Sequence, residues 1–141
     1  MQQEQAKRSV MDAWQAFGSR DAERIRACLA PDVQWLAPPG NATAVALDYT
    51  HHMVGPDSIV HFLVALFPRL FVADVQVEFG RVLCDGREVI LEERMRATLA
   101  NGRPYENDYC FIFTLDAEGR IERVREYMDT RKGQECIFGA A

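Results

Sequence analysis

The sequence predicts an α+β domain in which three N-terminal helices cover one face of an antiparallel sheet. In the first half of the chain, apolar residues recur at helical spacing. In the second half, polar and apolar residues alternate in four runs, and Asp-Gly and Asn-Gly pairs separate the first three. Such pairs are the strongest short signal for β-hairpins. Helices on one face of such a meander form an α+β domain, expected here as a single domain over residues 1–141.

Two helices are expected before the first strand. Residues 3–17 predict the first helix, since their apolar residues fall on one stripe and Gly18 can end it. A shorter helix should run from Asp21, a favourable N-cap residue, to about Leu29. The stripe residues are Ala6, Val10, Ala13, Trp14 and Phe17 in the first helix and Ile25, Cys28 and Leu29 in the second.

A short strand and a long loop are expected next. "DVQWL", residues 32–36, alternates as a strand does, whereas residues 38–54 show no clear period. Loops of this length are uncommon inside a domain and are often functional. The loop carries the adjacent His51 and His52, which cannot face one metal ion from the same side of a strand or helix. Contact with a ligand and simple exposure to solvent both stay open for them.

The third helix is predicted from "GPDSIVHFLVALFPRL", residues 55–70. Pro56 suits the first helical turn, and Pro68 should end the helix. Four strands follow, over residues 72–84, 87–100, 103–115 and 120–129.

The turns between these strands predict a register. Two-residue loops at the Asp-Gly and Asn-Gly pairs and a four-residue loop at "DAEG" place Val77 opposite Arg94, Arg94 opposite Tyr109, and Tyr109 opposite Glu126. The helices should then cover the face that holds Val75, Val77, Phe79, Glu92, Arg94, Arg96, Tyr109, Phe111, Phe113, Val124, Glu126 and Met128. The opposite face should expose Val89, Leu91, Met95, Ala97 and Ile112. Because exposed apolar patches mark interfaces, we expect a twofold homodimer packed sheet to sheet.

Arg94, Tyr109 and Glu126 form a row of side chains across three predicted strands. At the usual strand spacing, Arg94 and Glu126 can reach each other over the tyrosine ring. A carboxylate in an apolar cavity can have its pKa tuned for acid/base chemistry, and an arginine beside it can orient a substrate oxygen. The same row equally fits a structural ion pair buried beneath the helices.

Composition narrows the class of partner. A formal net charge of −5 without a basic cluster argues against nucleic acid and against an anionic membrane surface. No apolar run reaches the ~18 residues of a membrane span, and the N-terminal segment lacks the hydrophobic region of a secretory signal. The four cysteines form no CxxC pair, which predicts free thiols in a cytoplasmic protein. Without zinc-ligand spacing or a phosphate-binding glycine loop, we expect no metal and no cofactor.

Three stretches resemble the nuclear transport factor 2-like superfamily and, within it, the SnoaL-like and ketosteroid isomerase-like branch. They are "AWQAFGSRDAERIRACLAPDVQWLAPPG", "GPDSIVHFL" and "GRPYENDYCFIFTLDAEGRIERVREYMD". The most specific part is the aromatic-rich strand, the Gly-Arg-Ile turn and the ending "REYMD". The resemblance implies a curved sheet around a conical pocket that helices close, as in a cystatin-like α+β barrel, and often a dimer through the sheet.

The resemblance also suggests where catalytic residues would lie. Ketosteroid isomerases place a tyrosine, an aspartate base and a protonated aspartate where this chain has Ala13, Leu36 or Ala37, and Phe111. That isomerase mechanism therefore does not carry over with the fold.

Limonene epoxide hydrolases are similar in an Arg-x-Asp strand and a carboxylate on the last strand. The matching positions here are Arg94, Arg96, Glu126, Trp35 and Ala37, so one arginine and the last-strand carboxylate are retained. SnoaL-like cyclases rely on a carboxylate in the cone, a role that Glu126 can fill.

The sequence thus predicts a small-molecule enzyme of isomerase, cyclase or hydrolase type that acts on an apolar, oxygenated substrate. The alternative is a non-catalytic ligand-binding or accessory protein of the same fold. Glu126 is the expected general acid or base, and Arg94 and Tyr109 should bind a substrate oxygen. The residues expected to bind the rest of the substrate are Arg96, Trp14, Trp35, Phe79, Asn107, Phe111, Phe113 and Met128.

Overall fold

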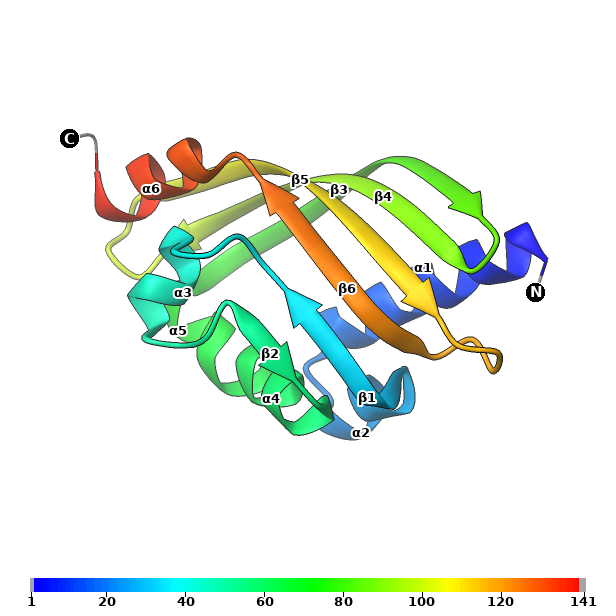
Figure 1. Ribbon diagram of the computed structural model, residues 1–141. Helices are drawn as coiled ribbons and strands as arrows, with labels where there is room; N and C mark the ends of the chain where they lie inside the picture. Colours follow the sequence, from blue (N-terminus) through cyan, green and yellow to red (C-terminus); the bar gives the residue numbers. More distant parts are fainter. Residues whose placement is uncertain (1, 140–141) are drawn as a thin grey trace.

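The protein is a curved, open sheet of six strands with helices packed against one side (Figure 1). A computed structural model describes residues 2–139. The elements, in chain order, are α1 (Gln3–Ser19), α2 (Ala22–Ala27), β1 (Leu29–Leu36), α3 (Ala42–Leu47), β2 (His52–Val54), α4 (Pro56–His61), the π-helical η1 (Phe62–Leu66), α5 (Phe67–Leu70), β3 (Phe71–Asp85), β4 (Glu88–Leu99), β5 (Pro104–Leu115), β6 (Ile121–Met128) and α6 (Thr130–Phe138).

The order of strands in the sheet is β2-β1-β6-β5-β4-β3. The predicted α+β class and the predicted meander of four strands are therefore confirmed. The sheet does not close into a barrel, because β2 and β3 form its two edges. β1 pairs with β6 in parallel and with β2 in antiparallel fashion.

The first two helices form where the sequence predicts them, although α2 ends at Ala27 and Leu29 begins β1. The buried side of α1 carries Ala6, Val10, Ala13 and Phe17, and the helix ends where Arg20 adopts a left-handed conformation with φ 58°. Asp21 caps α2, because its side chain accepts hydrogen bonds from the backbone N–H groups of the second and third residues that follow it.

Two parts of the chain differ from the expectation for helices and loops. Residues 38–54 are not one loop, because Asn41 caps α3 by accepting a hydrogen bond from the Ala44 N–H and the segment then forms the short strand β2. Pro68 does not end the third helix, which continues through α5 to Leu70. Pro68 has no N–H to donate to a helical hydrogen bond. It lies in the first turn of α5, directly after the wider π-helical turn η1.

The predicted pairing of β4 with β5 is wrong by one residue. The hairpin has a three-residue loop, in which Leu99 rather than Ala100 lies opposite Arg103 and the Leu99 N–H donates to the Arg103 carbonyl at 2.9 Å. Gly102 has φ 84°, the left-handed conformation that closes a loop of this kind. The Asn-Gly pair therefore signalled the hairpin correctly but not the length of its loop.

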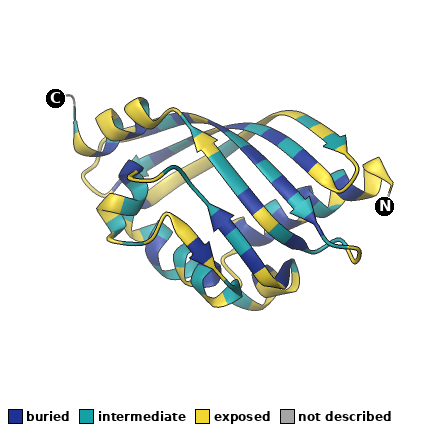
Figure 2. Cartoon of the chain, viewed as in Figure 1, coloured by how far each residue is buried: buried dark blue, intermediate teal, exposed yellow. Residues whose placement is uncertain are grey.

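A slip of one residue exchanges the two faces of a strand, and this determines which side chains of β4 are buried. Val89, Leu91, Met95 and Ala97 are buried beneath the helices rather than exposed on the outer face. The apolar patch from which the homodimer was inferred is therefore absent except for Ile112, and the dimer itself stays an untested prediction. Alternating buried bands along the strands are visible in Figure 2.

The pairing of β5 with β6 differs from the prediction by two residues, which leaves the faces unchanged. Glu126 lies opposite Phe111, and Val124 lies opposite Phe113. The inward face of β6 was thus predicted correctly, although Tyr109 lies opposite Met128 and not opposite Glu126.

An aromatic cluster joins α1 to the inner face of the sheet. The ring centroids of Trp14 and Phe111 are 4.9 Å apart, and those of Phe17 and Trp35 are 5.7 Å apart. Trp35 is 3% exposed, so packing on several sides holds its indole in one orientation. This fixed indole is what positions the candidate site.

Candidate functional site

Glu126 is the central residue of the candidate site. The parallel pairing of β1 with β6 places Trp35 opposite Val124, two residues before Glu126. The Trp35 Nε1–H donates a hydrogen bond of 2.8 Å to Glu126 Oε1. Burial raises the pKa of Glu126 to about 7, and the hydrogen bond from Trp35 partly opposes this rise. The carboxyl group therefore exists in both protonation states near neutral pH.

A second carboxyl group, Glu93, faces the same interior. It lies on β4 between Leu91 and Met95, is 6% exposed, and its Oε2 has no hydrogen-bond partner among the described residues. Burial, and next the charge of Glu126, raise the pKa of Glu93 to about 9. Glu93 is therefore a neutral carboxylic acid at neutral pH.

Two tyrosines form a buried hydrogen-bonded pair beside these carboxyl groups. Tyr109 lies opposite Glu93, and its hydroxyl is 2.5 Å from the hydroxyl of Tyr105. The side-chain amide of Asn107 donates to the Tyr105 hydroxyl at 3.2 Å and to the carbonyl of Asp129 at 3.0 Å. Burial raises the pKa of Tyr109 well above its ordinary value, which keeps this phenol protonated.

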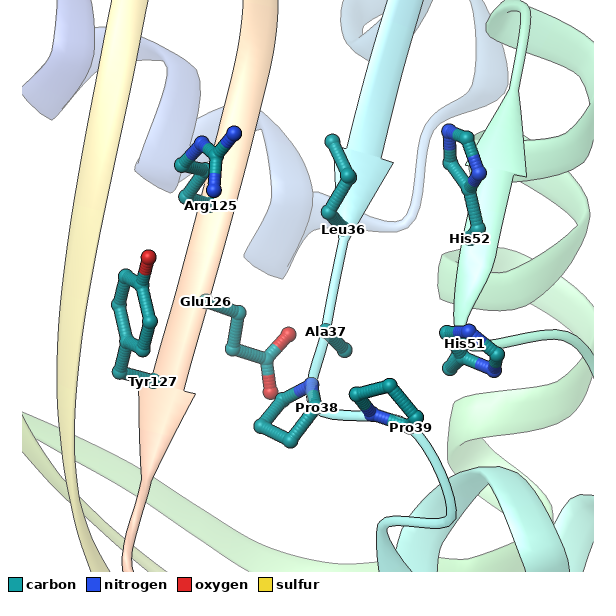
Figure 3. Close-up of a pocket in the computed structure, with 9 residues that line it drawn as sticks. All are labelled: Leu36, Ala37, Pro38, Pro39, His51, His52, Arg125, Glu126 and Tyr127. Atoms are coloured by element: carbon teal, nitrogen blue, oxygen red, sulfur yellow. The ribbon is translucent and has the colours of Figure 1, made fainter.

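Glu126 also lines an open pocket of about 380 Å³ between the ends of β1, β2 and β6. Figure 3 shows the carboxylate extending from β6 toward Ala37 and Pro38, with two histidines on the far side. The residues that line it, here called the Glu126 pocket, are Leu36, Ala37, Pro38, Pro39, His51, His52, Arg125, Glu126 and Tyr127.

A second hollow, of about 390 Å³, lies over β3, β4 and β5. Its residues are Glu78, Phe79, Gly80, Glu92, Glu93, Arg94, Asp108 and Tyr109. Most of its charged side chains belong to the outer face of the sheet, where Arg94 is already paired with Asp108. We therefore place the candidate site at the Glu126 pocket.

The predicted ion pair between Arg94 and Glu126 does not exist. The slip in register turns Arg94 outward, where its Nε donates to Asp108 Oδ1 at 2.7 Å. Arg96 is turned outward as well and bonds Glu106 Oε2 at 2.8 Å. Neither arginine can therefore serve Glu126 as a partner, whether catalytic or structural.

The other predicted site residues differ in where they lie. Phe79 lies on an edge strand and is 40% exposed, so the prediction that it lines a closed pocket is wrong. Asn107 is buried, and its amide is occupied by internal hydrogen bonds. The structure does bring together on the inner side Trp14, Trp35, Tyr109, Phe111, Phe113 and Met128.

Sequence reasoning missed Glu93, although a signal for it was present. The odd-numbered residues of β4 are apolar from Val89 to Leu99 except at position 93, while the even-numbered ones are mostly charged. This alternation alone marks Glu93 as an inward carboxylate. The register predicted from a two-residue loop at Asn101-Gly102 placed the opposite face of β4 inward, and the alternation was therefore not followed.

The described residues hold neither a cluster of metal-binding side chains nor a helix that could span a membrane. Over residues 2–139, no three His, Cys, Asp or Glu side chains are grouped so that they could hold a metal ion. Nor does any helix in that range combine the length and apolar character needed to cross a membrane.

Comparison with known families assigns the chain to one of them. The model of the SnoaL-like domain matches residues 10–124. The chain belongs to the SnoaL-like domain family. None of the curated proteins compared matches it.

Solved structures agree with this assignment at the level of the fold. An NTF2-like protein of unknown function from Burkholderia pseudomallei K96243 is 21% identical, with a TM-score of 0.81 over 97% of this chain and 98% of its own. An LEH-like epoxide hydrolase from M. tuberculosis is 19% identical, with a TM-score of 0.75 over 98% and 92%. A candidate SnoaL-like polyketide cyclase from Jannaschia sp. CCS1 is 16% identical, with a TM-score of 0.77 over 99% and 94%.

Proposed function

We propose that this SnoaL-like protein is a small-molecule enzyme that uses Glu126 as a general acid or base on an apolar, oxygenated substrate. One observation carries the proposal. Glu126 lines an open pocket, has one carboxylate oxygen held by the Trp35 N–H, and has a pKa raised to about 7. A group with a pKa near the working pH is best suited to both accept and return a proton.

The two oxygens of Glu126 have different roles in this mechanism. Oε1 accepts the Trp35 hydrogen bond, which fixes the plane of the carboxylate. The hydrogen bond from Trp35 leaves Oε2 as the oxygen proposed to meet the substrate in the pocket. Proton transfer then proceeds through Oε2, by removal of a proton from carbon or water and its return to a leaving or enolate oxygen.

Glu93 is a second carboxyl group that does not line the Glu126 pocket. Its pKa of about 9 keeps the proton on the carboxyl group at neutral pH, and its Oε2 is free of internal partners. Glu93 is therefore a buried neutral neighbour of Glu126, and the proposed proton transfer uses Glu126 alone.

The fold supports this class of chemistry without naming the reaction. A hydrolase and a candidate cyclase share the fold, and both reaction types require proton transfer. The mostly apolar lining of the Glu126 pocket, with Leu36, Ala37, Pro38 and Pro39, favours a substrate with an apolar body.

A non-catalytic binding protein is the second candidate. It is favoured because two catalytic residues of ketosteroid isomerases, a tyrosine and a protonated aspartate, are missing here. Their positions hold Ala13 and Phe111, which are 1% and 3% exposed and pack in the core. A binding protein would use the same pocket without turnover.

Turnover assays with Glu126→Gln decide between these functions. The panel should contain epoxides, β-keto esters and enones, because each of these needs proton transfer to or from carbon or oxygen. Glu126→Gln preserves the Trp35 hydrogen bond but removes the transferable proton, so we expect a rate loss of roughly 100-fold or more in a folded protein. The matched control is Glu122→Gln on the same strand, which should keep the wild-type rate.

Two results would contradict the catalytic proposal. One is full turnover by Glu126→Gln on a substrate that the wild type converts. The other is binding of panel compounds in the Glu126 pocket with no conversion of any, which supports the binding protein.

A further inference from the structure

Arg125 is a cation at the edge of the Glu126 pocket. It lies on the outer face of β6 opposite Ile112 of β5 and beside Leu36 of β1, so both neighbouring strands present it with apolar side chains. No carboxylate among residues 2–139 forms an ion pair with it. Arg94 and Arg96, on the same face, are both paired with carboxylates on β5.

The opposite wall of the pocket carries two imidazole side chains that can form hydrogen bonds. His52 is held by Gln34, whose Oε1 is 2.8 Å from His52 Nε2, and the ring of His51 lies beside it (Figure 3). Glu126 is the only carboxylate among the described residues that line the pocket, and its Oε1 is already bonded to Trp35. Among the described residues, the pocket therefore offers one cation without an ion pair and two imidazoles.

The middle of the pocket is apolar and rigid. Leu36, Ala37, Pro38 and Pro39 continue the line of β1, and two consecutive prolines restrict the backbone before any ligand binds. Tyr127 adds an aromatic ring that is 48% exposed on the Arg125 side. Preformed apolar walls with few polar groups at one edge are typical of sites for small amphipathic ligands.

We infer that the Glu126 pocket takes an organic acid: a flat apolar body against Pro38 and Tyr127, with a carboxylate or enolate bound by Arg125. A guanidinium suits this ligand because its parallel N–H groups match the two oxygens of a carboxylate. The inference rests on the proposed function, since it names the substrate class of the same pocket. Arg125 and Glu126 leave opposite faces of β6, and both line this pocket at the end of β1.

A pair of isosteric probes tests this inference. 2-Naphthoate and 2-naphthamide have the same shape, and only the first carries a charge. In ¹⁵N–¹H correlation spectra, 2-naphthoate should shift the backbone amides of Ala37 and Glu126 and bind at least about 10-fold more tightly than 2-naphthamide, as expected for a charge-assisted hydrogen bond.

Two arginine variants assign the effect. Arg125→Gln should remove the preference for 2-naphthoate and leave the affinity for 2-naphthamide unchanged. Arg123→Gln is the matched control, because Arg123 lies on the same face of the same strand, is exposed and is not part of the pocket. This control should keep the preference in full.

The inference is overturned if neither probe binds, if both bind equally, or if Arg123→Gln and Arg125→Gln act alike. Its failure can be told apart from failure of the catalytic proposal. Selective binding of 2-naphthoate without any Glu126-dependent turnover would leave the acid site and remove the catalysis. Glu126-dependent turnover of neutral substrates, unchanged in Arg125→Gln, would do the reverse.

Discussion

Replacing Glu93 with glutamine should make the protein more stable at alkaline pH, by an amount that grows as the pH rises. The folded protein holds the proton of Glu93 up to a pH of about 9, whereas the ordinary pKa of a glutamate is 4.5. The folded state therefore binds more protons than the unfolded state between these two values. Stability in this window must fall as the pH rises, because ionisation is easier in the unfolded chain.

The size of the effect follows from the shift in pKa. Each pH unit inside the window costs about 1.4 kcal/mol, so the free energy of unfolding should fall by about 4 kcal/mol from about pH 5 to about pH 8 through Glu93 alone. Glutamine has the same shape and does not titrate. Glu93→Gln should therefore match the wild type within about 1 kcal/mol at the acidic end and exceed it by several kcal/mol at the alkaline end.

Urea denaturation at both pH values measures this difference, with Glu92→Gln as the control. Glu92 is the neighbouring residue on β4, but its carboxylate is on the outer face and accepts a hydrogen bond of 2.9 Å from Arg81. That partner lowers the pKa of Glu92, so its replacement should not reduce the pH dependence. The reasoning is refuted if Glu93→Gln follows the wild-type curve in parallel across the range.

Two further predictions concern the surroundings of Glu126. Phe111→Asp should destabilise the protein by about 3–5 kcal/mol in urea melts, because Phe111 is 3% exposed and an aspartate there is buried without a partner. The control is Phe138→Asp, at a 49% exposed site, which should cost less than about 1 kcal/mol. Trp35→Phe removes the donor that lowers the pKa of Glu126, so the limb of the pH–rate profile that reports Glu126 should move to higher pH. An unmoved limb would mean that Glu126 is not the group that titrates in the reaction.

The sequence by itself determined the elements whose signals are local. The helical stripe ending in Phe17, the N-cap at Asp21 and the hairpin turns each depend on residues close together in the chain, and they predicted the α+β class correctly. Glu126 could also be placed on the inner face of β6, because the alternation with Val124 and Met128 identifies that face whichever loop precedes it.

Only the tertiary structure decided what Glu126 contacts. The length of the loop at Gly102 set the face of Arg94. A change of one residue there turned the expected arginine outward and turned Glu93 inward as the second carboxyl group. The hydrogen bond between Trp35 and Glu126 depends on the parallel pairing of β1 with β6. These two residues are 91 positions apart in the chain. Alternation within one strand carries no information on which distant strand will pair with it or in what register, because backbone hydrogen bonding is the same for every sequence. That choice is made only when the strands pack together into one sheet.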